Sequence, residues 1–231
     1  PNDIQLSRID KDYILGFLDY LKTAKQTHTK KEKLLHVNTQ VYYYKMLRYC
    51  LNYAVSEELI SANPMNKIKN EEKPHKHRTE REYLTIDELR KLAQTPFYNG
   101  LLKKAFLFSC FCGLRHSDII ALTWGDIEMD DDGNARLYII QKKTKEAISL
   151  PLSQEAIKQL PKREDAKEDD IIFKKLITLG RTNEILPKWA EQAGIKKHIT
   201  FHTARHTHAT MLLTLGVDLY TVSKLLGHTN I

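Results

Sequence analysis

The feature that most constrains this chain is a charged stretch at residues 69–82, which contains almost no apolar side chain and includes the run EEKPHKHR at 71–78. Such a segment cannot bury enough apolar surface to offset the entropy lost on ordering. The apolar residues before and after it must therefore form separate cores. We predict a helical domain over residues 1–70, a linker over 71–82 and a second domain over 83–231.

The first domain has two helical patterns. Residues 9–24 carry apolar side chains at helical spacing, and Asp10 is placed to cap the first turn. A second pattern follows, and we expect its helix to continue until the Asn63-Pro64 pair. The polar segment between them holds Lys30, Lys31 and Lys33. This lysine cluster is open to two interpretations, a solvated loop or an edge that contacts phosphates.

The second domain begins with a capping box, in which Thr85 is followed three residues later by Glu88. An apolar helix over 101–112 stops at Gly113, and another begins at Ser117-Asp118, so Arg115 lies in the turn between them. Residues 136–141 and 147–152 have the pattern of two strands, and the intervening turn is rich in lysine. Helices are expected over 153–160, 181–192, 203–215 and 219–226. The fold class is therefore mainly α with a small β-hairpin or sheet: a helical N-terminal domain and a mixed α+β second domain.

Composition sets the broad class of protein. The chain has 231 residues, of which 42% are hydrophobic, and a formal net charge of +7. This charge is compatible with a polyanionic partner but is common in other proteins. No apolar run is long enough to span a membrane, and the start lacks a signal-peptide pattern. The three cysteines have no CxxC spacing and lie among apolar residues, which indicates reduced core residues of an intracellular protein.

The strongest chemical signal is the HTAR motif at 202–205. His202 and Arg205 are three residues apart, so on a helix they share a face and can converge on one anion such as a phosphate. The same spacing also occurs in ordinary surface charge. His206 lies four residues after His202, a spacing found in zinc sites, but no cysteine lies nearby and the His-Glu-x-x-His motif is absent. We therefore predict no metal.

Three motifs together raise the phosphate interpretation above the others. They are CGLRHSDI at 112–119, HTAR at 202–205 and LGH at 226–228, with a lysine-bearing hairpin between the first two. In this order the chain resembles the tyrosine recombinase, or phage integrase, family. The helical segment 37–64, which contains LNYAV at 51–55, is similar to the core-binding domain of that family. The amino-acid sequence of these motifs is most similar to that of integrases of Bacteroides-type mobile elements.

The resemblance implies a catalytic set. Arg115 and Arg205 would be the two arginines that grip the scissile phosphate, and their charges suit a pentavalent transition state without a metal or other cofactor. His202 would assist proton transfer, and His228 would hydrogen-bond a phosphate oxygen. Lys143 would protonate the departing 5′ oxygen.

Lys142 and Lys145 are alternatives to this hairpin lysine, with contacts to the DNA backbone as their other role. Lys142 joins Lys30, Lys31, Lys33, Lys45 and Arg48 as candidate DNA-binding residues. The family attacks DNA with a tyrosine, giving a 3′-phosphotyrosine intermediate. We expect that tyrosine beyond Ile231, so that residues 1–231 are an inactive fragment. Tyr220 is a weak substitute because it precedes the LGH motif.

The resemblance also implies the setting. We expect a site-specific DNA recombinase or integrase that acts on double-stranded DNA, has no membrane partner and requires no cofactor. A homotetramer on DNA is expected, with a monomer in solution as an alternative, in the bacterial cytoplasm at the nucleoid. The rival interpretations are a helical DNA-binding regulator without catalysis and a metal-dependent phosphodiesterase that uses His202 and His206. The helical segment and the motif sequences resemble those of type IB topoisomerases less than those of integrases.

Overall fold

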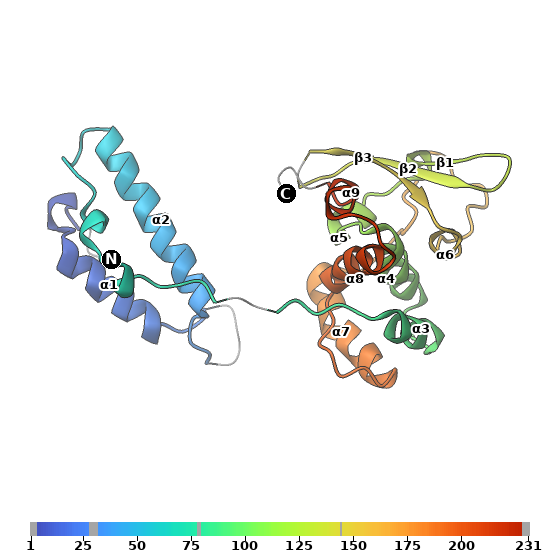
Figure 1. Cartoon of the computed structure of the whole chain (residues 1–231), viewed down its shortest axis with the longest axis horizontal. Coiled ribbons are helices and arrows are strands. Elements are labelled where there is room, and N and C mark those ends of the chain that lie inside the picture. The colour runs from blue at the N-terminus through green and yellow to red at the C-terminus, as the bar shows by residue number, and fades with distance from the viewer. Residues whose placement is uncertain (1–3, 28–31, 78–79, 144, 228–231) are drawn as a thin grey trace. The chain divides into compact units, whose positions relative to one another are not determined.

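The computed structural model describes residues 4–27, 32–77, 80–143 and 145–227, and it divides into two compact units, residues 1–80 and 81–231 (Figure 1). The first unit contains η1 (Leu6–Arg8), α1 (Lys11–Thr23), α2 (Val37–Ser56), η2 (Pro64–Lys67) and η3 (Asn70–Glu72). The second contains α3 (Ile86–Gln94), α4 (Gly100–Cys112), α5 (His116–Ile119), η4 (Trp124–Asp126), β1 (Ile127–Met129), β2 (Ala135–Ile140), β3 (Ala147–Leu152), α6 (Gln154–Ile157), α7 (Leu179–Gln192), α8 (Phe201–Thr214) and α9 (Leu219–Leu225). The mainly helical fold class with a small sheet is confirmed.

The first unit is built on α1 and α2, which pack against each other around Ile14, Leu18 and Leu51. Asp10 caps α1 by accepting a hydrogen bond from the backbone of Tyr13, as predicted. The prediction that the second helix continues to Asn63-Pro64 is wrong, because α2 ends at Ser56.

The chain after α2 makes a tight turn instead. Glu58 has a φ of 58°, in the left-handed region, which a continuing helix cannot contain. Asn63 then caps η2 by accepting from the backbone of Met65, and Pro64 occupies the first position of that short helix. Proline therefore begins a helix here, where its missing N–H costs nothing.

The segment predicted as a linker is partly ordered against the first unit. Glu72 forms an ion pair with Lys11 at 3.0 Å. The side chain of Asn38 donates to the carbonyl of His77 at 3.0 Å and accepts from its N–H at 2.8 Å. The absence of apolar residues excluded a core but did not exclude these polar contacts.

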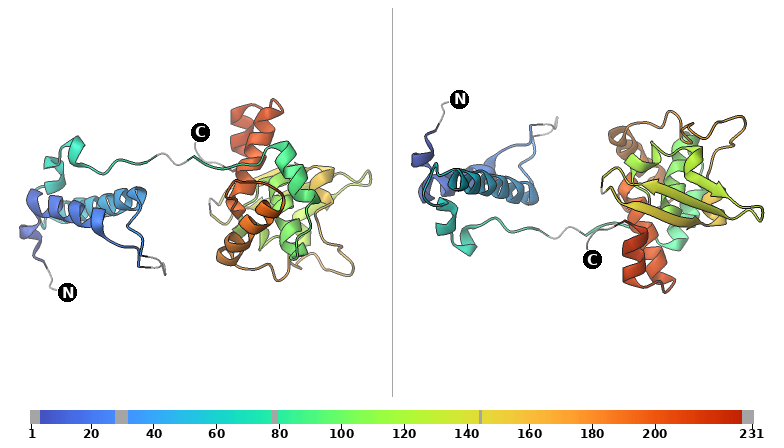
Figure 2. Two further views of the ribbon diagram at one scale, coloured as in Figure 1. Left: turned by 90° about the horizontal axis from the view of Figure 1, so that it is seen from below. Right: turned by 90° about the horizontal axis from the view of Figure 1, so that it is seen from above.

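The second unit is layered. A three-stranded antiparallel sheet in the order β1-β2-β3 covers one side of the central helices α4 and α8, and α3 and α7 lie on the other side (Figures 1 and 2). In the register of β2 and β3, Leu137 lies opposite Leu150, and both face the core. The first strand was not predicted, since its three residues are too few to show a period.

The core of this unit surrounds α4, most of whose residues are buried. The helix ends at Gly113, which has a φ of 72°, as its sequence predicts. Cys110 and Cys112 are buried in this helix, but Cys50 is exposed on α2, so the prediction of a core position is wrong for Cys50. Cys50 occupies the outward face of an amphipathic helix, which neighbouring apolar letters alone did not reveal.

The remaining helices agree with the expected patterns except in length. Thr85 and Glu88 form the predicted capping box of α3. The helix expected over 153–160 is the single turn α6, and the one expected from Ser117 is the single turn α5, which begins at His116. Within the described ranges, no helix is long and apolar enough to cross a membrane.

Candidate functional site

Arg205 occupies the buried side of α8. This helix packs against α4, and its N-terminus is capped by Thr200 and Thr203. The Arg205 side chain donates from Nη1 to the carbonyl of Gly113 at 2.9 Å and from Nη2 to the carbonyl of Leu226. Only 4% of the residue is exposed. Its guanidinium is therefore fixed by two backbone oxygens that are far apart in the sequence.

Arg115 is the N-cap residue of α5, directly after the left-handed turn at Gly113. Its backbone N–H donates to the carboxylate of Asp118 at 3.3 Å. Its side chain donates from Nη1 to Oε1 of Gln141. A β-carbon at Gly113 would lie 2.7 Å from Cδ2 of His208, so this turn is closely packed as well as left-handed.

The β2–β3 turn lies beside the turn that holds Arg115. Asp118, which is buried, also accepts from the backbone N–H of Lys142 at 3.1 Å. The same carboxylate thus joins the start of α5 to the hairpin. Lys142 and Lys143 are both exposed at this turn.

His202 is an exposed residue at the start of α8. Its pKa lies below the ordinary value because part of the ring is desolvated and because Arg205, Arg81, Arg115 and Lys143 place positive charge around it. Arg205 lies on the same helix as His202, and its bond to Gly113, together with the bonds of Asp118, brings the turns of Arg115 and Lys143 into this neighbourhood.

The ring of His206 lies edge-on to that of His202, with centroids 4.6 Å apart. Burial, followed by the influence of His202, Arg81 and Arg205, lowers the pKa of His206 to about 4. Both histidines are therefore neutral at pH 7. A neutral imidazole can accept a proton, which a charged one cannot.

The cluster of Arg115, Arg205, Arg81 and Lys143 carries more positive charge than the nearby carboxylate of Asp118 can neutralise. Burial and the nearby Arg115 lower the pKa of Arg205 to about 10, which still leaves it charged at pH 7. Among the ion pairs of the described residues, none involves Arg115, Arg205, Arg81 or Lys143. Like charges held together in this way favour a bound anion.

Hydrogen bonds place Arg205 and Arg115 at the turn that follows α4, beside the β2–β3 turn that carries Lys143. With His202 at the start of α8, these are four of the five residues predicted as catalytic: Arg115, Lys143, His202 and Arg205. The fifth, His228, lies outside the described residues, although Leu226 and Gly227 before it contact the cluster.

The predicted DNA contacts divide in the same way. Lys33, Lys45, Arg48 and Lys142 are exposed, the first three on the first unit and the last on the hairpin. Lys30 and Lys31 lie outside the described residues.

Three residues near the predicted catalytic set were not predicted to belong to the site. Asp118 was noted only as a helix start, Gln141 only as the end of a strand, and Arg81 was assigned to the linker. A polar residue that ends an apolar strand next to a lysine turn is a usable signal for Gln141. The sequence contains no local signal for the effect of the Arg81 charge on the pKa values of His202 and His206.

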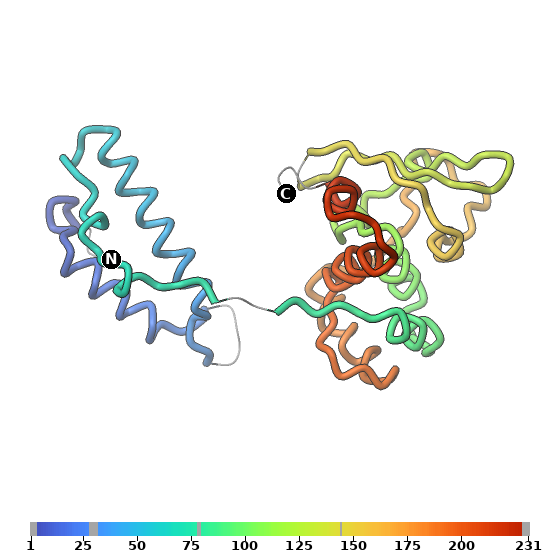
Figure 3. The backbone as a smooth tube through the Cα atoms, viewed as in Figure 1, coloured from blue at the N-terminus to red at the C-terminus, as the bar shows by residue number. Residues whose placement is uncertain are grey.

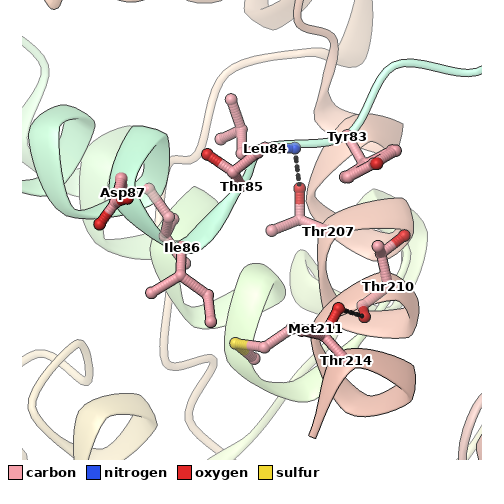
Figure 4. A pocket seen from close by; sticks show the side chains of 10 residues that line it. Tyr83, Leu84, Thr85, Ile86, Asp87, Thr207, Thr210, Met211 and Thr214 are labelled. Carbon is pink, nitrogen blue, oxygen red and sulfur yellow. Dashed lines mark hydrogen bonds between the residues drawn. The ribbon is translucent and has the colours of Figure 1, made fainter.

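Across the described part of the chain, no group of three His, Cys, Asp or Glu side chains could hold a metal ion. A separate pocket of about 220 Å³ lies between the start of α3 and the C-terminal half of α8 (Figure 4). Its lining includes Leu84, whose N–H donates to Thr207 Oγ1 at 2.9 Å, but none of the predicted catalytic residues.

The sequence matches two family models. Residues 82–231 match the phage integrase family, and residues 1–71 match the phage integrase SAM-like domain. The chain is 29% identical to a tyrosine recombinase of Pseudothermotoga lettingae, over 100% of this chain and 78% of that protein. It is 32% identical to the tyrosine recombinase XerD of Listeria innocua, over 82% of this chain and 67% of that protein.

Solved structures show the same fold. A lambda integrase dimer bound to a COC′ core site aligns with a TM-score of 0.73 at 22% identity, covering 100% of this chain and 80% of that one. The XerH site-specific recombinase bound to its difH substrate aligns with a TM-score of 0.68 at 19% identity, covering 97% and 66%.

Proposed function

This chain belongs to the phage integrase family of tyrosine recombinases, and from that premise we propose that it takes part in cutting and rejoining double-stranded DNA at specific sites. The observation that carries the proposal is the cluster of Arg115, Arg205 and Lys143 around His202, whose positive charges outnumber the nearby carboxylate of Asp118. A phosphodiester in this cluster would compensate the excess positive charge. The reaction proposed is strand transfer through a 3′-phosphotyrosine intermediate.

The roles follow from the chemistry of each group. The two guanidinium groups of Arg115 and Arg205 would bind the non-bridging oxygens of the scissile phosphate and stabilise the charge of its transition state. The neutral ring of His202 would accept the proton of the attacking hydroxyl. Lys143, on the exposed turn, would donate a proton to the departing 5′ oxygen. His228 would donate a further hydrogen bond to the phosphate.

We propose that residues 1–231 alone bind DNA without forming the covalent adduct. Among the described residues, no tyrosine hydroxyl is hydrogen-bonded to Arg115, His202 or Arg205. Tyr220 is exposed on α9 and its ring lies 5.5 Å from Nζ of Lys224.

The two units have distinct proposed tasks. Residues 1–70 would bind DNA as the core-binding domain, residues 71–82 would link the units, and residues 83–231 would form the catalytic domain. The exposed surface of α2 supports the first task, because Lys45 and Arg48 lie there among the exposed tyrosines Tyr42, Tyr49 and Tyr53. Cations and aromatic hydroxyls are suited to phosphate contacts.

The proposed setting is the nucleoid of a bacterium, where the protein would serve a mobile element of the type found in Bacteroides. The complexes of lambda integrase include a tetramer bound to a Holliday junction. We propose by analogy that four copies of the chain form a homotetramer on two duplexes. In solution the chain would be a monomer, and the tetramer would assemble only on DNA.

The test is DNA binding by the 231-residue chain, measured by fluorescence anisotropy on a duplex selected from a randomised pool. The affinity should fall steeply as salt rises, because bound phosphates release counterions. Arg115→Ala should weaken binding about tenfold, since a hydrogen-bonded charge contact is worth about 1.5–3 kcal/mol. Arg90→Ala, at an exposed ion pair with Asp87, is the matched control.

Two outcomes would contradict the proposal. If the Arg115→Ala and Arg90→Ala variants bound DNA with equal affinity, Arg115 would not be part of a phosphate site. A covalent adduct trapped on a nicked duplex would contradict the missing nucleophile, and its loss in Tyr220→Phe would identify that residue.

A further inference from the structure

Gln141 is the buried residue at the base of the β2–β3 turn, with 0% of its surface exposed. Its side-chain amide bonds in two directions. Oε1 accepts from Nη1 of Arg115, and Nε2 donates to the carbonyl of Leu226 at 3.1 Å. The amide therefore spans from the first arginine to the end of α9, two places far apart in the sequence. The backbone tube shows the hairpin of β2 and β3 beside α9 (Figure 3).

The carbonyl of Leu226 also accepts from Nη2 of Arg205. One backbone oxygen thus accepts hydrogen bonds from the amide of Gln141, which holds Arg115, and from Arg205. Through this oxygen the positions of the two guanidinium groups depend on each other.

The backbone of Gln141 holds the lysine turn as well. Its N–H donates to the carbonyl of Glu146, and its own carbonyl accepts from Lys145, both at 2.9 Å. Lys143 is carried between these two anchors. A change in the position of Gln141 would therefore move the hairpin lysine together with Arg115.

The turn after α9 is fitted to the same amide. Gly227 has a φ of 65°, and a β-carbon there would lie 2.7 Å from Oε1 and 2.9 Å from Cδ of Gln141. No real β-carbon fits at that distance, so a glycine is required by the close approach of the amide.

We propose that Gln141 is a positioning residue that sets the guanidinium of Arg115 against that of Arg205, so that both reach the oxygens of one phosphodiester. The inference rests on the proposed function of this cluster. Two like charges repel each other, so Arg115 needs an acceptor to remain beside Arg205. A neutral amide provides that acceptor without cancelling the charge meant for the phosphate, whereas a carboxylate would form an ion pair and compete with it.

A double-mutant cycle on the 231-residue chain tests this role, with the duplex and anisotropy assay described above. Gln141→Met keeps the volume and removes the amide hydrogen bonds to Arg115 and Leu226. We expect it to weaken DNA binding about tenfold in the wild-type background and less than twofold in the Arg115→Ala background, because hydrogen bonds to a charged group couple strongly. Gln154→Met, the same substitution at an exposed glutamine, is the control and should change affinity less than twofold in both backgrounds.

A purely structural role would give a different result. Equal losses of affinity in both backgrounds would overturn the proposal, because Gln141 would then act independently of Arg115. If the wild-type chain bound no DNA, that result would contradict the proposed function. The contact between Gln141 and Arg115 would then be tested by hydrogen exchange at the Arg115 guanidinium.

That second measurement needs no folded variant of Gln141. In the 15N-arginine-labelled wild-type chain, the Nη protons of Arg115, identified by their loss in Arg115→Lys, should exchange with water at least about tenfold more slowly than those of Arg90. The hydrogen bond of Arg90 to Asp87 is exposed to solvent, whereas Arg115 donates to the buried amide of Gln141. Exchange at the same rate as Arg90 would overturn the proposed contact. This result also decides the inference if Gln141→Met does not fold.

Discussion

Arg205 on α8 donates from Nη1 to the backbone carbonyl of Gly113 at 2.9 Å. This bond joins the second arginine of the cluster to the left-handed turn that precedes the first, Arg115. The two arginines are thus placed by the main chain of a turn whose own geometry depends on a glycine. Stability and phosphate binding should therefore respond together to changes here.

Arg205→Lys should lower the free energy of unfolding by about 2 kcal/mol, since a lysine cannot reach both carbonyls and leaves a buried acceptor unsatisfied. Urea denaturation measures this loss. Arg181→Lys, at an exposed pair with Glu184, is the control and should cost about 0.5 kcal/mol or less. Equal costs for the two variants would show that the buried carbonyl contacts contribute nothing.

Gly113→Ala and Gly194→Ala form a matched pair, because both glycines have a φ of 72°. The left-handed backbone costs an alanine about 1–2 kcal/mol at either position. Only at Gly113 would the new methyl group also meet His208 and Leu226, at 2.7 and 2.9 Å; at Gly194 nothing lies within 4 Å. We expect Gly113→Ala to lose at least about 1 kcal/mol more in thermal or urea unfolding, and equal losses would contradict the close packing.

Stability should fall as pH drops from about 6.5 to about 4. Burial lowers the pKa of His208 to about 4 from an ordinary 6.5, with the charge of Arg205 acting in the same direction and the carbonyl of Cys110 opposing it. The unfolded state therefore binds a proton in this window that the folded state does not, a slope of about 1.4 kcal/mol per pH unit for one proton. His206, with a pKa of about 4, acts in the same window.

Unfolding free energies measured across this pH range in the wild type and in His208→Phe would test the assignment. The apolar ring removes the titrating group, so the variant should show a shallower slope. A slope unchanged by the substitution would assign the pH dependence to other groups. Asp170 and Asp218, whose pKa values lie below the ordinary 3.8, titrate below this window.

Lys143→Gln should raise the pKa of His202, because it removes one of the positive charges that hold that pKa down. The shift should be smaller than that of Arg115→Ala, since Arg115 acts on the ring more strongly. Proton NMR titration of the His202 ring measures both. Lys142→Gln serves as the control; a larger shift for Lys142 than for Lys143 would exchange their proposed roles.

The fold was predictable where the signal is local. Asp10 and Thr85 cap their helices as the sequence indicates, because a capping hydrogen bond spans only three residues. The end of α2 was missed, since the turn at Glu58 has no glycine or proline to mark it.

The sequence by itself determined the helical periods, the hairpin with its lysines, the turn at Gly113 and the family to which the chain belongs, because these depend on short patterns. Only the tertiary structure decided that Gln141 holds Arg115 across 26 residues and Leu226 across 85. It also decided that Arg81 acts on His202. The physical reason is that a side-chain contact between distant elements depends on how those elements pack, and no local period records that packing.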